Sequence, residues 1–350
     1  MAKGYSKDQP QGFTNRIEKV AIVGAGGQMG KHLTSHLLQT GKHTVTAITR
    51  PDSTSKMPDG VHIAHVDYIN DKDDDDAALV DVLRGHQALI ITMSIAAPRG
   101  TAMSKLLHAA AKAGVSYVLP NWFGHDAAND SLCEDSLLRA GRDGLHAEVA
   151  GLGSDAPRLI LLMCNFWYEF SLGGGPDRFG FDFAKRELVL FDEGDVPINV
   201  STWPQSGRAV AALLSLKELP DGEDDAAPAL SRFCDDNVDG GVYVASFRVS
   251  QSDMFESVKR VTGTTDSDWK IMRESAEQRW REGRAAIAKG DFAQFTKMLY
   301  SRMFVPTGDG DYESRRGLHN GILGLPVEDL DECTAVGVRM GENGEVAHSQ

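Results

Sequence analysis

Short apolar runs alternate regularly with amphipathic segments through the first half of this 350-residue chain. Leucine and valine recur at three- to four-residue spacing between the runs, which predicts helices. The apolar runs are the length of strands that are buried on both faces. This alternation predicts an α/β fold built on a Rossmann-like, doubly wound parallel sheet. Its first five strands are expected at residues 19–24, 43–49, 61–66, 88–92 and 115–119.

The second half follows a different rhythm. A helix at 134–150 and a sixth strand at 158–163 continue the sheet, and the segments 187–191 and 197–200 then predict a hairpin across Glu-Gly-Asp. We therefore expect a smaller, discontinuous substrate domain at the C-terminal end. The expected division is a flexible arm at 1–17, a dinucleotide-binding domain at 18–165, and a part at 166–345 that mainly binds substrate, with some segments returning to the sheet.

The strongest motif is Gly-Ala-Gly-Gly-Gln-Met-Gly, between the first predicted strand and the first predicted helix. Its glycines follow the spacing G-x-x-G-x-x-G. Such a turn lets the backbone approach a pyrophosphate, while the N–H groups that open the helix point at the anion. A tight turn without a ligand is the alternative, but the strand–turn–helix context favours a dinucleotide. The predicted contacts are Gly24, Gly27, Gln28, Met29 and Gly30.

The end of the second strand predicts which dinucleotide binds. Basic residues there favour the 2′-phosphate of NADP, whereas an acidic residue favours the ribose hydroxyl of NAD. The strand ends at Thr49 and Arg50, and Lys56 follows. Arg50 suits a phosphate through its planar fork, although Asp52 is close and a solvated surface arginine is the alternative. We predict NADPH.

Further cofactor contacts are expected where the third and fourth strands end, because ligands collect beyond the carboxyl ends of parallel strands. Asp67 and Tyr68 would lie near an adenine ring, and Thr92, Met93 and Ser94 near the central ribose. Ordinary loop residues are the alternative for each of these positions.

These motifs resemble the NmrA-like and isoflavone-reductase-like group of atypical short-chain dehydrogenases. The glycine turn, Thr49-Arg50, the run V-S-Y-V-L-P-N-W-F-G at 115–124 and Asn165-Phe166 carry the resemblance, which covers roughly 18–215. Later stretches resemble fungal members tied to secondary metabolism. The resemblance implies NADP(H) binding, with activities from reduction of phenolic or carbonyl substrates to redox sensing without turnover. It adds Pro120, Asn121 and Asn165 to the expected cofactor contacts.

The chain departs from that group at two places. Reductases of the group carry a lysine on the helix before the sixth strand, and the corresponding helix here contains none. Arg139 and Arg142 stay protonated, so neither is a natural proton donor, and His146 is the nearby group that titrates near neutrality. The Ser-Glu pair of the family is replaced by Asn121 and Trp122, which removes a carboxylate.

A tyrosine followed four residues later by lysine, the usual proton source of short-chain dehydrogenases, is also missing at the two candidate tyrosines. Tyr117 is followed by Asn121, and Tyr168 by Leu172. Tyr168 and then His125 are our candidate catalytic donors, with a hydrogen-bonded structural role as the alternative for each. The aromatic run 166–170 is expected to supply core residues and one or two rings of an apolar pocket wall.

Composition limits the partners. The 36 basic and 50 acidic residues give a formal charge of −14, which argues against nucleic acid or an anionic membrane as a partner. No apolar run approaches a membrane span or a signal peptide, so we expect a cytoplasmic protein. The four cysteines lack metal-binding spacing, so no metal site is predicted and buried, reduced thiols are expected.

Three functions remain open. The favoured one is an NADPH-dependent oxidoreductase acting on an apolar small metabolite, for example an aromatic or alkaloid-like one. The second is a non-catalytic regulatory protein that senses NADP(H) and changes its affinity for a protein partner, which the missing lysine supports. The third is a non-redox cyclase or isomerase on the same fold.

Overall fold

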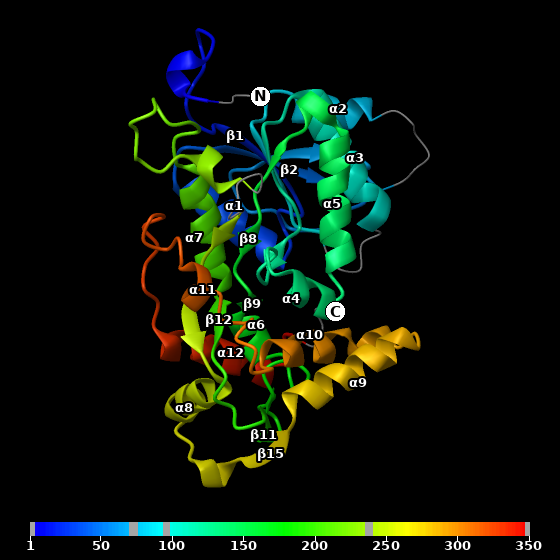
Figure 1. Ribbon diagram of the computed structural model, residues 1–350, viewed down its shortest axis with the longest axis vertical. Helices are drawn as coiled ribbons and strands as arrows, with labels where there is room; N and C mark the ends of the chain where they lie inside the picture. Colours follow the sequence, from blue (N-terminus) through cyan, green and yellow to red (C-terminus); the bar gives the residue numbers. More distant parts are fainter. Residues whose placement is uncertain (1–3, 70–75, 94–98, 235–240, 347–350) are drawn as a thin grey trace.

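The computed structural model describes residues 4–69, 76–93, 99–234 and 241–346. They form an upper lobe built on a parallel sheet and a lower lobe of shorter strands and helices (Figure 1). Across these residues, every helix is too short or too polar to span a membrane.

The upper lobe contains a six-stranded sheet whose strands all run parallel. The spatial order is β3-β2-β1-β4-β5-β7, so the chain starts in the middle and winds outward in both directions. This order defines a Rossmann-like sheet and confirms the predicted fold class. The strands are β1 (Lys19–Val23), β2 (Thr44–Thr49), β3 (His62–His65), β4 (Ala88–Ile91), β5 (Tyr117–Leu119) and β7 (Arg158–Leu159).

Helices cover both faces of this sheet. Alternate residues of β1 face opposite ways: Val20 and Ile22 pack toward α1 (Gln28–Gln39) and α7 (Trp203–Leu214). Ala21 and Val23 pack toward the other layer. Because both faces are covered, the central strands can be apolar throughout, as the sequence shows. The other layer consists of α2 (Ala77–Leu83), α3 (Arg99–Ala113) and α5 (Arg139–Gly151).

The helix α7 comes from the second half of the chain but packs along α1 in the upper lobe. A close approach requires glycine at position 207, where a Cβ would lie 2.7 Å from the carbonyl oxygen of His32. The Trp203 ring stacks on the His32 ring at 5.8 Å. The chain therefore returns from the lower lobe to complete the core beneath the sheet.

The lower lobe has its own core of aromatic and aliphatic side chains. Three three-stranded sheets, ordered β10-β11-β15, β14-β12-β9 and β13-β8-β6, complete the structure. Their strands are β6 (Phe123–Gly124), β8 (Leu162–Met163), β9 (Phe166–Trp167), β10 (Phe181–Asp182), β11 (Glu187–Phe191), β12 (Ile198–Ser201), β13 (Val242–Tyr243), β14 (Phe247–Val249) and β15 (Lys270–Glu274). The remaining helices are α4 (Asp130–Asp135), α6 (Tyr168–Leu172), α8 (Gln251–Thr262), α9 (Ala276–Ala288), α10 (Phe295–Met303), α11 (Glu313–Arg316) and α12 (Leu330–Glu342).

Two predicted elements are divided. The sixth strand, expected over 158–163, splits into β7, which pairs with β5, and β8, which pairs with β6 and β13. The amide of Leu162 donates to the carbonyl of Trp122, so the chain leaves the main sheet at that point. The helix expected over 134–150 divides into α4 and α5, with Leu137 in the left-handed region at φ 62° between them.

The predicted hairpin between 187–191 and 197–200 is wrong. In the structure β11 pairs with β10 and β15, whereas β12 pairs with β9 and β14 in another sheet. The amide of Asp192 donates to the carbonyl of Glu274, which extends the pairing of β11 with β15. Both Asp192 and Gly194 adopt positive φ angles, 54° and 73°, and direct the chain away from a two-stranded turn.

The N-terminal residues were expected to form a loose arm, but residues 6–17 contact the loop that follows α7. The amide of Ser6 donates to the carbonyl of Pro220, and the Asn15 side chain bonds both the amide and the carbonyl of Leu219. Ile17 is 1% exposed in the upper core. The arm is therefore tied to the upper lobe from Ser6 onward.

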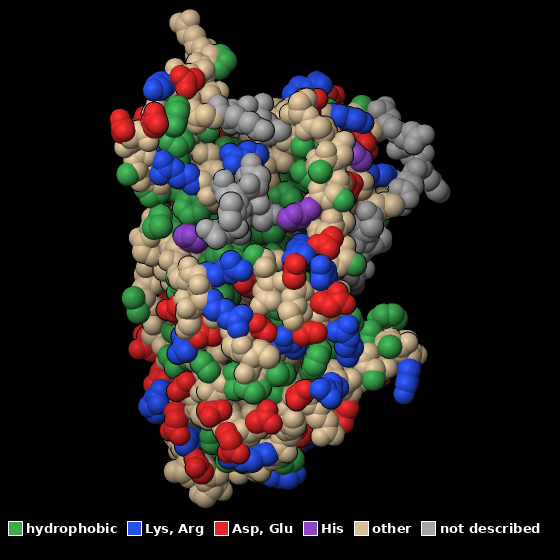
Figure 2. Space-filling model, viewed as in Figure 1, with side chains coloured by type: hydrophobic (Ala, Val, Ile, Leu, Met, Phe, Trp, Pro, Cys, Tyr) green, Lys and Arg blue, Asp and Glu red, His purple; other side chains and the backbone are tan. Residues whose placement is uncertain are grey.

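Acidic and basic side chains are interspersed over the face of the lower lobe that Figure 2 shows. Many of them form surface ion pairs, such as Arg281 with Glu277 on α9.

Candidate functional site

The glycine turn is held tightly against the neighbouring strand. Gly24 adopts φ +84°, and a Cβ there would lie 2.3 Å from the carbonyl oxygen of Thr92. The Thr92 hydroxyl donates to the carbonyls of Val23 and Gly24, at 3.0 and 3.1 Å. These contacts join the end of β4 to the turn. They place Thr92 directly beside the glycine turn, and its predicted position near the central ribose stays a prediction.

The helix α1 begins on the second motif glycine, Gly27, which is its N-cap residue. A Cβ at Gly30 would lie 1.9 Å from the carbonyl oxygen of Gly24, so the first helical turn packs directly on the glycine turn. Gln28 is exposed and Met29 is 5% exposed in the core. The N–H groups of a first helical turn lack intrahelical acceptors and suit an anion.

The loop after β2 lies over the same turn. A Cβ at Gly26 would be 2.6 Å from the carbonyl oxygen of Lys56, whose side chain is exposed. The Arg50 guanidinium is half exposed and lies 3.7 Å from the Asp52 carboxylate. Burial raises the pKa of Tyr68, and the nearby positive charge of Arg50 opposes this rise. Arg50, Lys56 and Tyr68 therefore belong to one side of the glycine turn.

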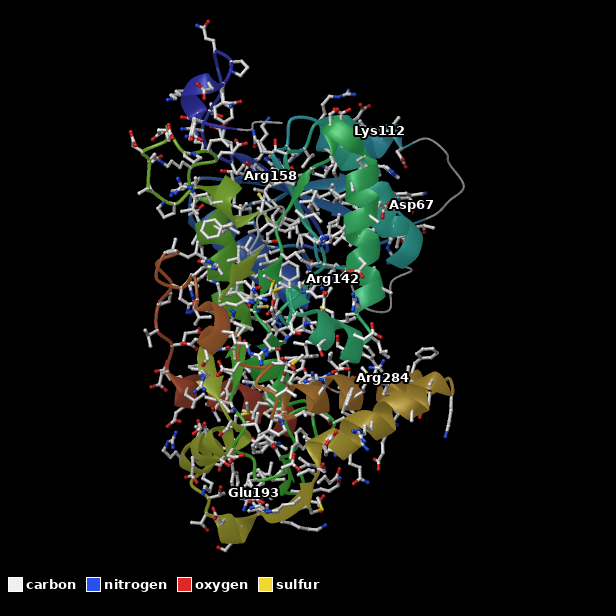
Figure 3. The ribbon with its side chains drawn as sticks, in the orientation of Figure 1. Asp67, Lys112, Arg142, Arg158, Glu193 and Arg284 are labelled. Atoms are coloured by element: carbon white, nitrogen blue, oxygen red, sulfur yellow. The ribbon has the colours of Figure 1, made fainter. Side chains whose placement is uncertain are left out.

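The Asn121 amide donates to the carbonyl of Met93 at 2.9 Å and so joins the ends of β4 and β5. Pro120 is buried beside it. Asp67 follows β3, near the right-hand edge of the upper lobe in Figure 3, and its carboxylate accepts from the amide of Ile69 at 3.0 Å. Ser94 lies outside the described residues. The structure thus gathers Thr92, Met93 and Asn121 at one edge of the sheet.

Asn165 occupies a different environment from the other expected cofactor contacts. It is 3% exposed, adopts φ 51°, and its amide donates to the carbonyl of Asn199 at 2.7 Å. Its Oδ1 atom is buried without a hydrogen-bond partner among the described residues. The side chain therefore joins the ends of β8 and β12, and its role in cofactor binding stays a prediction.

The geometry does not favour Tyr168 as a proton donor. Its side chain is fully buried in the lower core, its hydroxyl is 2.7 Å from the Thr334 hydroxyl on α12, and burial raises the pKa of the phenol. The hydroxyl is thus occupied within the protein. The sequence could not reveal this, because a tyrosine after a strand is compatible with either a core or a pocket position.

His125 is likewise buried, at 4% exposure, and its Nε2 is 2.9 Å from the Ser136 hydroxyl. Burial lowers the pKa of His125 to about 4, so the ring is neutral at physiological pH. A neutral, hydrogen-bonded ring under the surface fits the structural alternative stated for it.

The helix α5 corresponds to the helix on which reductases of the resembled group carry a lysine. In this chain, a side chain of α5 holds a neighbouring loop in place. Arg142 lies near its lower end in Figure 3 and donates to the carbonyl of Ala127 at 2.6 Å. Its guanidinium also pairs with Asp130 at 2.8 Å and with Asp143 at 2.7 Å. Arg142 therefore positions the loop after β6, which agrees with the expectation that it does not replace the missing lysine.

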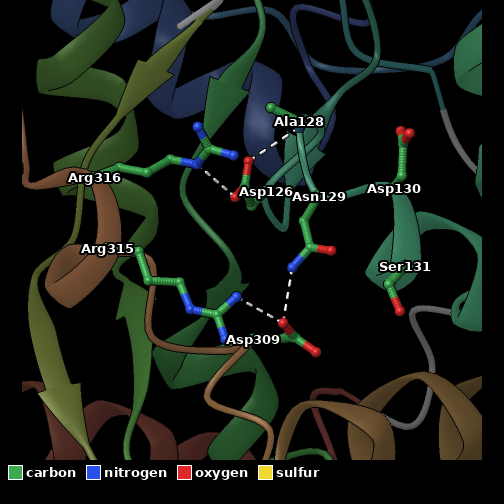
Figure 4. A pocket seen from close by; sticks show the side chains of 8 residues that line it. All are labelled: Asp126, Ala128, Asn129, Asp130, Ser131, Asp309, Arg315 and Arg316. Carbon is green, nitrogen blue, oxygen red and sulfur yellow. Dashed lines mark hydrogen bonds and ion pairs between the residues drawn. The ribbon is translucent and has the colours of Figure 1, made fainter.

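An open pocket of about 580 Å³ lies between this loop, α4 and α11 with the segment before it (Figure 4). Arg316 pairs with Asp126 at 2.7 Å, and Arg315 pairs with Asp309 at 2.7 Å. The pocket is polar, whereas an aromatic wall was expected from the run 166–170. Its lining consists of Asp126, Ala128, Asn129, Asp130, Ser131, Asp309, Arg315 and Arg316.

The rings of the run 166–170 mostly form core. Phe166 stacks on Tyr300 at 3.7 Å inside the lower lobe. Trp167 and Phe170 are partly buried and pack around Trp203, at 6.0 and 5.4 Å, where the two lobes meet. These two rings are the members of the run that remain candidates for a pocket wall.

Glu169 is a buried acid that was not among the residues predicted from the sequence. It is 5% exposed, its Oε1 accepts from the Trp203 amide at 2.9 Å, and its Oε2 has no hydrogen-bond partner among the described residues. Burial raises the pKa of Glu169 to about 7. Its position in the run N-F-W-Y-E-F, flanked by aromatic residues, was the signal that could have found it.

Replacing Glu169 with glutamine is expected to change how stability depends on pH. Between pH 4.5 and 7 the unfolded chain loses this proton while the folded chain keeps it, so the parent protein loses stability as pH rises through that window. The loss approaches about 3 kcal/mol. Glu169→Gln should lack this pH-dependent loss. The free energy of unfolding of the variant, measured by urea titration, should therefore rise relative to that of the parent as the pH increases to 7. A constant difference would contradict the raised pKa.

The sheet order, the glycine turn and the helix that begins on it define an α/β protein with a Rossmann-like fold. Residues 16–134 match the model of the NmrA-like family, which confirms the resemblance that the motifs indicate. Oxidoreductase aprR of Aspergillus flavus is 26% identical over 331 residues, covering 91% of this chain and 97% of that protein. This fungal relative agrees with the expected class of protein, an oxidoreductase.

Solved structures share the fold. A structure from a study of pinoresinol-lariciresinol and phenylcoumaran benzylic ether reductases matches with a TM-score of 0.68 at 14% identity, covering 91% of this chain and 99% of that one. Quinone oxidoreductase QOR2 of Escherichia coli, solved in complex with NADPH, matches with a TM-score of 0.58 at 17% identity, covering 90% and 98%.

Proposed function

We propose that this chain is an NADPH-dependent oxidoreductase that acts on a small, apolar and partly aromatic metabolite. The observation that carries the proposal is the glycine turn, closed against Thr92 and followed at once by the helix α1. The named activity of the fungal relative and the NADPH complex of the bacterial one support it. A cytoplasmic location belongs to the same proposal, and the formal charge of −14 argues against nucleic-acid partners.

The residues present fit this cofactor. The turn is tight in the way that a pyrophosphate-binding turn requires, because a Cβ at Gly24, Gly26 or Gly30 would collide with backbone atoms. The first turn of α1 would hold the pyrophosphate, and Arg50 with Lys56 would hold the 2′-phosphate. Tyr68, Thr92, Met93 and Asn121 would line the remaining length.

When bound, NADPH supplies a hydride, and the protein contributes orientation and electrostatics. The Asn121 amide fixes the ends of β4 and β5 relative to each other, and the Thr92 hydroxyl fixes β4 relative to the turn. Trp167 and Phe170 offer apolar surface where the lobes meet. This surface suits a planar substrate, which is why we propose an aromatic one.

Replacing Arg50 with alanine is expected to weaken NADPH binding by about 10- to 100-fold, because a charge-assisted hydrogen bond contributes about 1.5–3 kcal/mol. NADH lacks the 2′-phosphate, so its dissociation constant should stay within about twofold. Fluorescence titration of both nucleotides measures the effect. Arg84→Ala is the matched control, since Arg84 is a surface arginine paired with Asp81 on α2. Equal losses for both nucleotides would contradict the assignment.

A regulatory NADP(H) sensor is the second candidate. The burial of Tyr168 and His125, together with the structural use of Arg142 on the lysine-free helix α5, favours it. The two functions separate in one comparison. An oxidoreductase consumes NADPH with at least one member of a carbonyl, enone, quinone and imine panel, whereas a sensor binds NADPH with no turnover and changes its affinity for a partner with the NADPH to NADP⁺ ratio.

A further inference from the structure

Among the described residues, three arginines are buried in the lower lobe, and one of them forms no ion pair within 4.0 Å, although the charge of Asp177 acts on it. Arg178, Arg279 and Arg302 are 5%, 4% and 2% exposed. Arg279 pairs with Glu274 and lies 3.8 Å from Asp177, and Arg302 lies 2.7 Å from both Asp135 and Asp309. Within the described chain, no carboxylate oxygen lies within 4.0 Å of the Arg178 guanidinium. An unpaired buried charge destabilises a fold unless something else compensates for it.

The protein compensates for this charge in part. The Nη1 atom of Arg178 donates to the carbonyl of Phe170 at 3.0 Å, and the guanidinium carbon lies 3.8 Å from the centre of the Phe170 ring. Burial lowers the pKa of Arg178, yet a guanidinium remains protonated at neutral pH. In the part of the chain that the structure describes, its Nε and Nη2 atoms have no hydrogen-bond acceptor. Two donors of a planar fork therefore remain available.

The segment that carries Arg178 is built to hold this side chain. A Cβ at Gly174 would lie 2.3 Å from the Cδ atom of Arg178, so the arginine can lie flat on the backbone because position 174 is glycine. The amide of Arg178 donates to the carbonyl of Gly175 at 3.1 Å, and Arg279 donates to the carbonyl of Pro176 at 2.9 Å. These contacts fix the guanidinium before any ligand arrives.

The surroundings combine aromatic surface with polar hydroxyls. The Phe170 ring covers one face of the guanidinium, and the positive charge of Arg178 acts on Tyr300. Burial raises the pKa of Tyr300 and this charge opposes the rise, while the Tyr300 hydroxyl lies 2.7 Å from the Ser171 hydroxyl. A guanidinium fork with free donors matches a planar carboxylate, and the neighbouring rings match an aromatic group.

We propose that Arg178 is the binding residue for the carboxylate of an aromatic acid ligand, which supplies the missing counter-ion. The Nε and Nη2 donors bind the two carboxylate oxygens, and the aromatic ring of the ligand packs on the rings around Phe170. The proposal rests on the proposed function in one respect: the aromatic acid is identified with the substrate or product of the same enzyme.

The first test measures thermal unfolding of the full chain with benzoate and with benzamide, its neutral counterpart, at matched ionic strength. We expect saturating benzoate to raise Tm by about 3 °C and benzamide to leave it unchanged. The benzoate effect should vanish in Arg178→Met and persist in Arg281→Gln, a control on exposed α9 surface. No shift with benzoate in the parent protein, or a shift that survives in Arg178→Met, would overturn the proposal.

The second test needs no ligand. Because Arg178 has no ion-paired carboxylate to leave behind, Arg178→Met is expected to unfold at the same temperature as the parent or above it. Arg302→Met, which leaves two carboxylates with fewer partners, should unfold well below it. An equal loss in both variants would assign Arg178 a structural role and overturn the proposal. NADPH titration of the parent and of Arg178→Met tests the proposed function separately. If NADPH did not bind, the proposed function would fail, but the benzoate result would be unaffected.

Discussion

Alanine at position 30 is expected to remove NADPH binding and to destabilise the upper lobe by about 3 kcal/mol or more. The new Cβ would lie 1.9 Å from the carbonyl oxygen of Gly24 and 2.8 Å from its carbonyl carbon. Both are backbone atoms, so either the glycine turn or the first turn of α1 must move. Because the anion site consists of those two segments, their displacement should lower affinity for NADPH more than 100-fold. Fluorescence titration and urea unfolding measure the two effects.

The control for this variant is another helical glycine. Gly141 lies within α5, and a Cβ there would have no neighbour within 4 Å. Gly141→Ala should be neutral or more stable by about 0.5–1 kcal/mol, because alanine has the higher helix propensity. NADPH binding should be unchanged. If Gly30→Ala behaved like Gly141→Ala, the close packing of the turn on α1 would not be required for cofactor binding.

Replacing Arg302 with methionine is expected to lower the free energy of unfolding by about 3–5 kcal/mol. Arg302 lies on α10 and joins Asp135 at the end of α4 to Asp309, so the variant leaves two carboxylates with fewer partners. Burial raises the pKa of Asp309, but the hydrogen bonds from Thr307, Arg302 and two further side chains together have a larger effect and hold that pKa low. The stability contributed by Asp309 is therefore present at neutral pH and lost under acidic conditions.

Urea unfolding at pH 7 measures this loss. Arg281→Gln provides the comparison, because Arg281 forms a surface pair with Glu277 on α9 and should contribute less than about 1 kcal/mol. A loss of similar size in both variants would show that the buried cluster around Asp309 is no stronger than a surface pair.

The upper sheet could be predicted because its signals are local. Each strand is one apolar run, and each helix has its own hydrophobic periodicity. The glycine turn lies between the first strand and the first helix. Right-handed crossover connections then restrict how the strands can be arranged in the sheet. The pairing of β11 with β15 could not be predicted in this way, since Glu187 and Lys270 are far apart in the sequence and neither strand carries a mark of its partner.

The candidate site was predictable to a similar extent. Thr92 was placed by topology and Asn121 by the family resemblance, and the structure brings the ends of their strands together. Burial decided the remaining cases: Tyr168, a candidate donor, has its hydroxyl satisfied inside the core, whereas Arg178, which the sequence analysis did not single out, retains available donors. Nothing in residue type distinguishes these states, because they depend on what distant helices such as α10 and α12 bring to each side chain.

The return of α7 to the upper lobe has a consequence for how this protein could be divided or recombined. A chain cut at residue 165 would keep all six strands of the main sheet but lose the helix that covers α1, and apolar residues of α1 such as Leu33 and Leu37 would face water. Such a fragment should aggregate rather than fold. Exchanging substrate lobes between relatives would therefore require α7 to stay with the sheet, so that the exchanged part consists of separate segments rather than one continuous half.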